Sequence, residues 1–135
     1  MILVTGGTGT TGGELVRLLH DIDAPPRFLV MVRNSEKGRE LEARGISTIP
    51  GDFGDPASLS RAMENVDSLF LLSPSVENQA QLQINAVNAA VGSGIRYIVK
   101  VSARGAALDS PLTLGRAHAE VEQALADSGI DHTIL

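Results

Sequence analysis

The chain has 135 residues, of which 43% are hydrophobic and 20% charged, a composition typical of one globular domain. Its net charge of −5 argues against a general nucleic-acid-binding protein, because such proteins need a basic surface. The absence of cysteine excludes disulfides, thiolate metal sites and a cysteine nucleophile. No segment reads as a signal peptide or a membrane span, so we expect a cytoplasmic protein that binds neither nucleic acid nor membranes.

Short apolar runs alternate with helical stretches along the whole chain. Runs of this kind are typical of strands that are buried on both faces of a parallel sheet. Six strands are therefore predicted, over residues 2–4, 28–32, 46–49, 68–72, 97–101 and 133–135.

Five helices are predicted between these strands. Ser35 is the predicted N-cap of the second helix, which ends near Gly45, and Asp55 with Pro56 after it begins the third. Apolar stripes at helical spacing indicate the other three, at Leu15, Leu18, Leu19 and Ile22, at Val76, Ala80, Ile84, Val87 and Val91, and at Leu114, Ala117, Val121 and Leu125.

This alternation predicts a Rossmann-type α/β fold, in which right-handed crossovers cover both faces of a doubly wound parallel sheet. No linker or repeat divides the chain, so residues 1–135 are predicted to form one domain. The last predicted strand ends at Leu135, and we expect the chain to be a fragment or the ordered part of a longer protein.

A glycine-rich loop, TGGTGTTG at residues 5–12, joins the first predicted strand to the first helix. Its glycines permit a tight turn, a close approach of the backbone to a pyrophosphate, and close helix–strand packing. The helix that follows offers free N–H groups to an anion. A plain surface turn is the alternative, but it does not account for the strand before the loop and the amphipathic helix after it. We predict a dinucleotide site at Gly6, Thr8, Gly9, Thr10, Thr11 and Gly12.

The end of the second predicted strand bears on the choice of cofactor. Sites that prefer NAD usually carry Asp or Glu there, whereas this chain has Val32, Arg33, Asn34 and Ser35. Arg33 is placed to meet a 2′-phosphate, with Asn34 and Ser35 as further hydrogen-bonding groups. Lys37 is a weaker second cation, or more simply a helix residue that faces solvent. NADP(H) is thus favoured over NAD(H), the alternative for Arg33 being a solvated residue at a strand end.

Several segments of the chain resemble the NmrA-like, atypical short-chain dehydrogenase/reductase family. The C-terminal segment looks most similar to its NADPH-dependent quinone reductase branch. The segments are TGGTGTTG (5–12), VRNSEK (32–37), GD (51–52), DPASL (55–59), VDSLFLLSP (66–74) and HAEVEQALADSGIDHTIL (118–135).

The resemblance implies a sheet in the order 3-2-1-4-5-6 and a bound NADP(H). By resemblance, the loop residues Thr8 to Thr11 bind the pyrophosphate and Arg33 binds the 2′-phosphate. Family members continue past the sixth strand into a smaller substrate-binding lobe. The resemblance also implies that two further groups of residues line the cofactor, Asp52 and Phe53 beside the adenine, and Leu72, Ser73 and Pro74 near the nicotinamide-side ribose.

The usual catalytic tyrosine of short-chain dehydrogenases is absent. Their Tyr-x-x-x-Lys pair would fall at Leu114 and His118, and the single tyrosine, Tyr97, begins the fifth predicted strand. His118 could orient the ribose or donate a proton, or it could be a helix histidine exposed to solvent. Ser102 could bind substrate or ribose, or simply end its strand. These two are the catalytic candidates, and the histidines show no metal-ligand spacing.

Two functions share these motifs. One is an NADPH-dependent reductase of quinones or similar small electrophiles, because such a hydride acceptor needs little beyond positioning over the nicotinamide. The other is a non-catalytic NADP(H)-sensing regulator that acts through a protein partner. A nucleotide-sugar enzyme is disfavoured by the missing Tyr-x-x-x-Lys pair, and we expect an NAD(P)H-dependent oxidoreductase.

Overall fold

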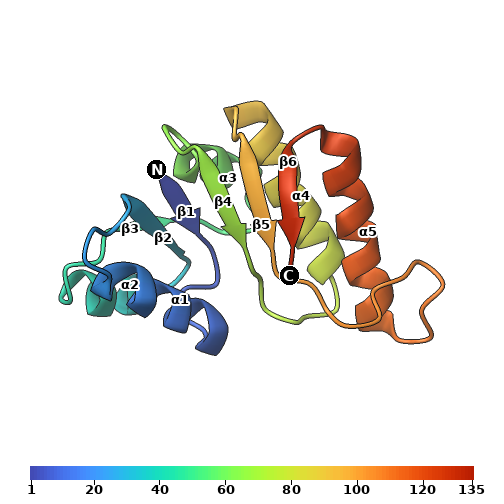
Figure 1. Cartoon of the computed structure of the whole chain (residues 1–135), viewed down its shortest axis with the longest axis horizontal. Coiled ribbons are helices and arrows are strands. Elements are labelled where there is room, and N and C mark those ends of the chain that lie inside the picture. Colours follow the sequence, from blue (N-terminus) through green and yellow to red (C-terminus); the bar gives the residue numbers. More distant parts are fainter.

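Six parallel strands form the centre of the fold in the computed structural model, which describes all 135 residues (Figure 1). Their order is β3-β2-β1-β4-β5-β6, which confirms the predicted topology. The crossover from β3 to β4 places β4 beside β1, so the strand order reverses direction there. The strands are β1 (Ile2–Val4), β2 (Phe28–Val32), β3 (Thr48–Pro50), β4 (Ser68–Leu71), β5 (Tyr97–Lys100) and β6 (Asp131–Ile134).

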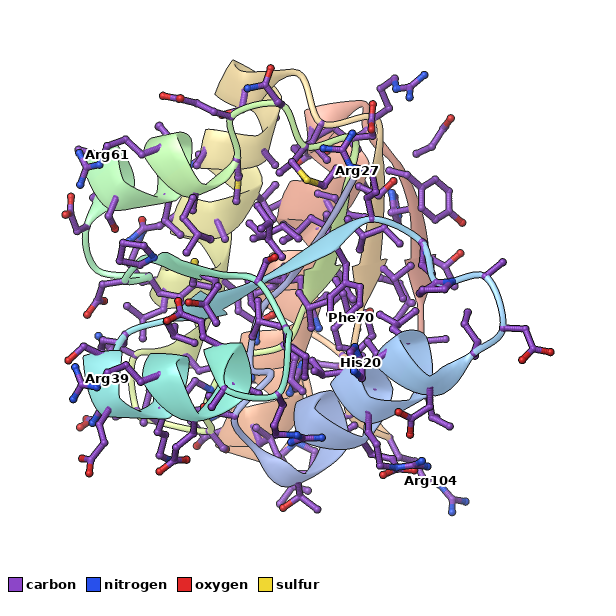
Figure 2. The ribbon with its side chains drawn as sticks, turned by 90° about the vertical axis from the view of Figure 1, so that its left-hand side faces the viewer. His20, Arg27, Arg39, Arg61, Phe70 and Arg104 are labelled. Carbon is purple, nitrogen blue, oxygen red and sulfur yellow. The ribbon has the colours of Figure 1, made fainter.

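Helices cover both faces of this sheet (Figure 1). Successive strand residues point to opposite faces, so Leu3 packs with α3, α4 and α5, and Val4 packs with α1 and α2. Phe70 also faces α1, as Figure 2 shows. No helix has the length and hydropathy that crossing a membrane requires. The helices are α1 (Thr10–Asp21), α2 (Ser35–Glu42), α3 (Pro56–Ala62), α4 (Gln79–Ser93) and α5 (Thr113–Ser128).

Local sequence signals set several of the helix ends. Asp55 accepts a hydrogen bond from the backbone N–H of Ala57, and Pro56 follows it, as predicted for the start of α3. Gly94 and Gly129 end α4 and α5 in the left-handed conformation, with φ of 74° and 72°.

The predicted apolar stripes of α4 and α5 are partly wrong. Val76 precedes α4 and is 47% exposed, Val91 is 50% exposed, and Leu114 of α5 is 44% exposed. Helix α4 packs against α3 and α5 as well as the sheet, so its buried side is not one apolar stripe. That side includes two polar residues, Gln79 and Gln83, which are 3% and 1% exposed.

Candidate functional site

The carboxyl ends of all six strands meet at one edge of the sheet, where the loops that follow β1, β2, β3 and β4 come together (Figure 1). The strand order reverses between β1 and β4, which is the switch point where open α/β sheets bind their ligands. The predicted site residues lie along this edge.

The glycine-rich loop has the shape that a dinucleotide requires. Gly6 adopts φ of +68°, and a Cβ there would lie 2.8 Å from the carbonyl oxygen of Leu72. A Cβ at Gly12 would overlap the carbonyl oxygen of Gly6, so α1 can approach the strand only with glycine at this position. A Cβ at Gly9 would meet nothing closer than 3.4 Å. Gly9 therefore faces open space, where backbone can approach a ligand closely.

Helix α1 begins within this loop, at Thr10, without a side-chain cap. The backbone N–H groups of its first turn have no partner inside the helix, and the helix dipole adds positive potential there. Thr10 and Thr11 are exposed in this turn, as the predicted phosphate site requires. The loop and the start of α1 together fit a pyrophosphate.

Thr5, which sequence reasoning did not single out as a site residue, fixes the loop against β4. Its hydroxyl is buried, donates to the carbonyl oxygen of Phe70 at 2.9 Å, and accepts from the N–H of Leu72 at 2.9 Å. These bonds hold the exit of β1 beside residues 72–74. The only sequence signal for this role is a threonine directly after a buried strand.

A cleft of about 320 Å³ lies on one side of the loop. The volume is within the range of sites for small ligands. The residues that line it come from the ends of β1, β2, β3 and β4 and from the starts of α2 and α4. They are Gly6, Thr8, Met31, Arg33, Asn34, Lys37, Gly51, Asp52, Phe53, Pro74, Val76 and Leu82.

Two cations border the cleft after β2. Arg33 is exposed and has no ion pair, and Lys37, in the first turn of α2, is exposed and lines the same cleft. The prediction of Ser35 as the N-cap of α2 is wrong. Asn34 caps the helix, because its side-chain oxygen accepts from the N–H groups of Glu36 and Lys37 at 2.8 and 3.3 Å.

Asp52 and Phe53 form the opposite wall after β3. The Asp52 carboxylate accepts from the N–H of Gly54 at 2.7 Å, and the Ser58 hydroxyl accepts from the N–H of Asp52 at 2.9 Å. The carbonyl oxygen of Phe53 accepts from the Asn85 side chain at 2.9 Å. These bonds fix the wall, and the carboxylate stands after β3 rather than after β2.

The residues after β4 lie on the same carboxyl edge of the sheet and lead away from the cleft. Pro74 still lines the cleft, and Ser73 turns toward α4, where its hydroxyl accepts from the Gln83 amide at 2.8 Å. The Gln83 side-chain oxygen has no partner, although it is buried. Leu72 contributes its backbone to the contact with Thr5 and Gly6.

His118 belongs to a buried chain of polar side chains. It is 7% exposed, so the alternative of a helix histidine exposed to solvent is wrong. Its Nδ1 lies 2.8 Å from Lys100 Nζ, and its Nε2 lies 3.0 Å from Gln79 Nε2. Burial lowers the pKa of Lys100 to about 8, although Glu122 nearby opposes this shift. Burial and the Lys100 charge also lower the pKa of His118.

Ser102 and Tyr97 lie at opposite ends of β5. The Ser102 hydroxyl donates to the carboxylate of Glu122, so that carboxylate is not simply part of a polar helix face. Tyr97 contacts the Thr133 hydroxyl at 2.6 Å, at the amino end of the strand and away from the site. No group of three His, Asp or Glu side chains is arranged to hold a metal ion.

Comparison with known proteins identifies the family. Residues 6–135 match the model of a family described as NAD(P)H-binding. The chain belongs to this family. The matched range includes the glycine-rich loop, Arg33 and the wall at Asp52, so the predicted NAD(P)H-binding Rossmann domain is confirmed, as is the resemblance to NmrA-like and quinone reductase proteins.

Named reductases are among its relatives. The chain is 42% identical to an NAD(P)H azoreductase of Xenophilus azovorans over 135 residues, which are all of this chain and 46% of that protein. It superimposes with a TM-score of 0.90 on the NADPH-dependent quinone oxidoreductase of Escherichia coli in complex with NADPH, at 38% identity, over 99% of this chain and 47% of that one.

A third relative has the same fold at lower identity. The triphenylmethane reductase of Citrobacter sp. in complex with NADP(H) has a TM-score of 0.90 at 29% identity, over 99% of this chain and 48% of that one. The chain thus spans about half the length of each of these relatives.

Proposed function

We propose that the chain is the NADP(H)-binding domain of a cytoplasmic NADPH-dependent reductase that acts on quinones or similar small electrophiles. The observation that carries the cofactor preference is the pair of cations, Arg33 and Lys37, on the β2 side of the cleft. A 2′-phosphate carries negative charge that only NADP(H) presents, and an arginine fork binds it with charge-assisted hydrogen bonds. Residues 32–35, at the end of β2, include no carboxylate to bind free ribose hydroxyls.

Different residues along the carboxyl edge of the sheet would bind different parts of the cofactor. The glycine-rich loop and the start of α1 would bind the pyrophosphate, and Asp52 and Phe53 would border the adenine. Residues 72–74, held by Thr5, would border the nicotinamide-side ribose. NADPH supplies a hydride when it is bound, and the protein contributes orientation and charge. The similarity to an azoreductase and a quinone oxidoreductase supports an electrophilic acceptor.

A second candidate is an NADP(H)-sensing regulator that signals to a protein partner. One observation favours it: His118, the predicted proton donor, is 7% exposed, and leucine occupies the usual tyrosine position at 114. We rank the reductase first because an acceptor of hydride needs positioning more than it needs a strong acid.

The cofactor preference is tested with Arg33→Ala. A charge-assisted hydrogen bond contributes about 1.5–3 kcal/mol, or roughly ten- to over a hundredfold in affinity. We expect calorimetric titration to show a loss of this size for NADPH and almost none for NADH. Arg39→Ala is the matched control, since Arg39 points outward from α2 (Figure 2) and should change neither affinity. Equal losses for both cofactors would rule out recognition of the 2′-phosphate by Arg33.

The reaction is tested by NADPH oxidation with and without a quinone, in the full-length protein of which this chain would be the NADP(H)-binding domain. Acceptor-dependent oxidation supports the reductase. Tight NADPH binding without oxidation for quinones, azo compounds and other electrophiles supports the regulator instead.

A further inference from the structure

Lys100 is a buried cation without a bound carboxylate. Its side chain is completely buried at the end of β5, and its ammonium contacts His118 Nδ1 at 2.8 Å and the carbonyl oxygen of Val101 at 3.3 Å. Burying a charge without a close counter-ion is costly, and proteins keep such groups mainly at functional sites. The position at the carboxyl edge, between the cofactor loops and α5, places Lys100 beside the proposed nicotinamide end.

The hydrogen bonds of this chain allow two arrangements. When Lys100 is an ammonium it can only donate, so His118 Nδ1 must accept and the ring proton must sit on Nε2. The Nε2–H then needs an acceptor, and only the side-chain oxygen of Gln79 can serve. When Lys100 is an amine, its lone pair can accept from His118 Nδ1–H, and Nε2 then accepts from the Gln79 amide nitrogen.

The observed contact of 3.0 Å between His118 Nε2 and Gln79 Nε2 belongs to the second arrangement. In that arrangement the Gln79 side-chain oxygen is buried and has no protein partner. Turning the amide by 180° exchanges atoms of nearly equal size. The turned amide gives the first arrangement. The Gln79 oxygen then accepts from His118, and the amide nitrogen lies where the oxygen was.

We infer that Lys100 is a positioning residue of the proposed reductase site: the proton of its ammonium holds His118 in the Nε2–H tautomer with the Gln79 oxygen turned toward it, and loss of that proton permits the second arrangement. The inference rests on the proposed function. As an ammonium, Lys100 also places one positive charge beside Leu71 at the end of β4, next to the proposed nicotinamide side, where it would favour the negative charge that develops on an acceptor as hydride arrives. Gln79 begins α4, and its side-chain oxygen accepts from His118 in this state, whereas its amide nitrogen donates to His118 in the other.

Few other groups act on this pair. From α5, the Glu122 carboxylate favours the charged forms of Lys100 and His118. From α4, the facing side chains Gln79 and Gln83 are neutral. Ser102, at the end of β5, is neutral and is bound to Glu122. The ionisation state of Lys100 therefore decides which of the two hydrogen-bond arrangements of His118 and Gln79 is more stable.

The tautomer is tested by NMR on protein labelled with ¹⁵N-histidine, without cofactor. We expect His118 to be the Nε2–H tautomer at pH 7 and to change its ¹⁵N shifts with a midpoint near pH 8, set by Lys100. Lys100→Met should remove this transition, and Arg44→Met, at an exposed position away from the site, should keep it. His20 and His132 are exposed internal references. An unchanged His118 titration in Lys100→Met overturns the inference.

The catalytic consequence is tested separately. In the full-length protein that contains this domain, kcat for quinone reduction should fall with a midpoint near pH 8. In its Lys100→Met variant kcat should be at least tenfold lower and flat through this range, with unchanged KM for NADPH. A profile that keeps its midpoint in the variant overturns the positioning role. If no acceptor is reduced, the proposed function fails, while the NMR result still decides whether Lys100 controls His118.

Discussion

Lys100→Met should make the protein more stable at neutral pH, although it removes a buried hydrogen bond. Methionine keeps the unbranched shape of lysine without its charge. The fall of the Lys100 pKa from 10.5 to about 8 corresponds to a cost of about 3 kcal/mol for burying the ammonium. Loss of the donor to His118 costs about 1–2 kcal/mol in return. We therefore expect a net gain of about 1–2 kcal/mol at pH 7.

The stability difference between Lys100→Met and wild type should change sign at alkaline pH. Between pH 8 and 10.5 the unfolded chain still binds the Lys100 proton and the folded chain does not, so wild type gains stability as the pH rises. Near pH 10 the burial cost is largely relieved, and Lys100→Met should be less stable than wild type by about 1 kcal/mol. Each kcal/mol corresponds to about 3–5 °C in Tm for a chain of this length.

Thermal unfolding followed by circular dichroism at pH 7, 8.5 and 10 measures both the gain at neutral pH and its reversal at alkaline pH. Lys37→Met is the matched control for removal of a lysine, because Lys37 is exposed. A variant that is destabilised at pH 7, or whose difference from wild type does not vary with pH, would refute the reasoning that Lys100 is held as a costly buried cation.

Two further predictions concern the cofactor loop and the cap of α2. Gly9→Val should fold normally and lose NADPH binding, because its side chain would fill the open space over the loop, whereas Gly92→Val, also with free space around its Cβ, should bind normally in a fluorescence titration. Unchanged affinity in Gly9→Val would remove the loop from the site. Asn34→Ala should lower the free energy of unfolding by about 1 kcal/mol in urea and Ser35→Ala by much less, since Asn34 makes the capping bonds; the reverse order would contradict the assigned cap.

The elements and the cofactor loop could be predicted because their signals are local. Alternating short apolar runs and helices define a parallel sheet almost without regard to side-chain detail. The predicted and observed ends of each strand differ by no more than two residues. The strand predicted at 46–49, for example, begins at Thr48. The loop between β1 and α1 is equally local, because its glycines permit backbone positions that a Cβ would block.

The buried polar contacts could not be predicted, because they join residues far apart in the chain. Thr5 meets Phe70, and Lys100 meets His118 across 18 positions, only after the sheet has formed. The apolar spacing of α4 and α5 was also misleading, since each helix contacts more than one neighbour. Leu114 matched the spacing but lies outside the core, while His118 takes a buried position on the same helix.

The two ends of the carboxyl edge differ in physical character, and this difference matches the two tasks of a reductase. At the adenosine end, the proposed recognition of fixed charge by backbone N–H groups and exposed cations such as Arg33 requires affinity but no change of protonation. At the other end, Lys100, His118 and Gln79 are shielded from water, so one proton changes their hydrogen bonds and the local charge together. The exposed charge of Arg33 is screened by salt, whereas Lys100 is buried and little screened, and burial lowers its pKa to about 8. Cofactor binding and the proposed hydride transfer can therefore be tuned independently within one sheet edge.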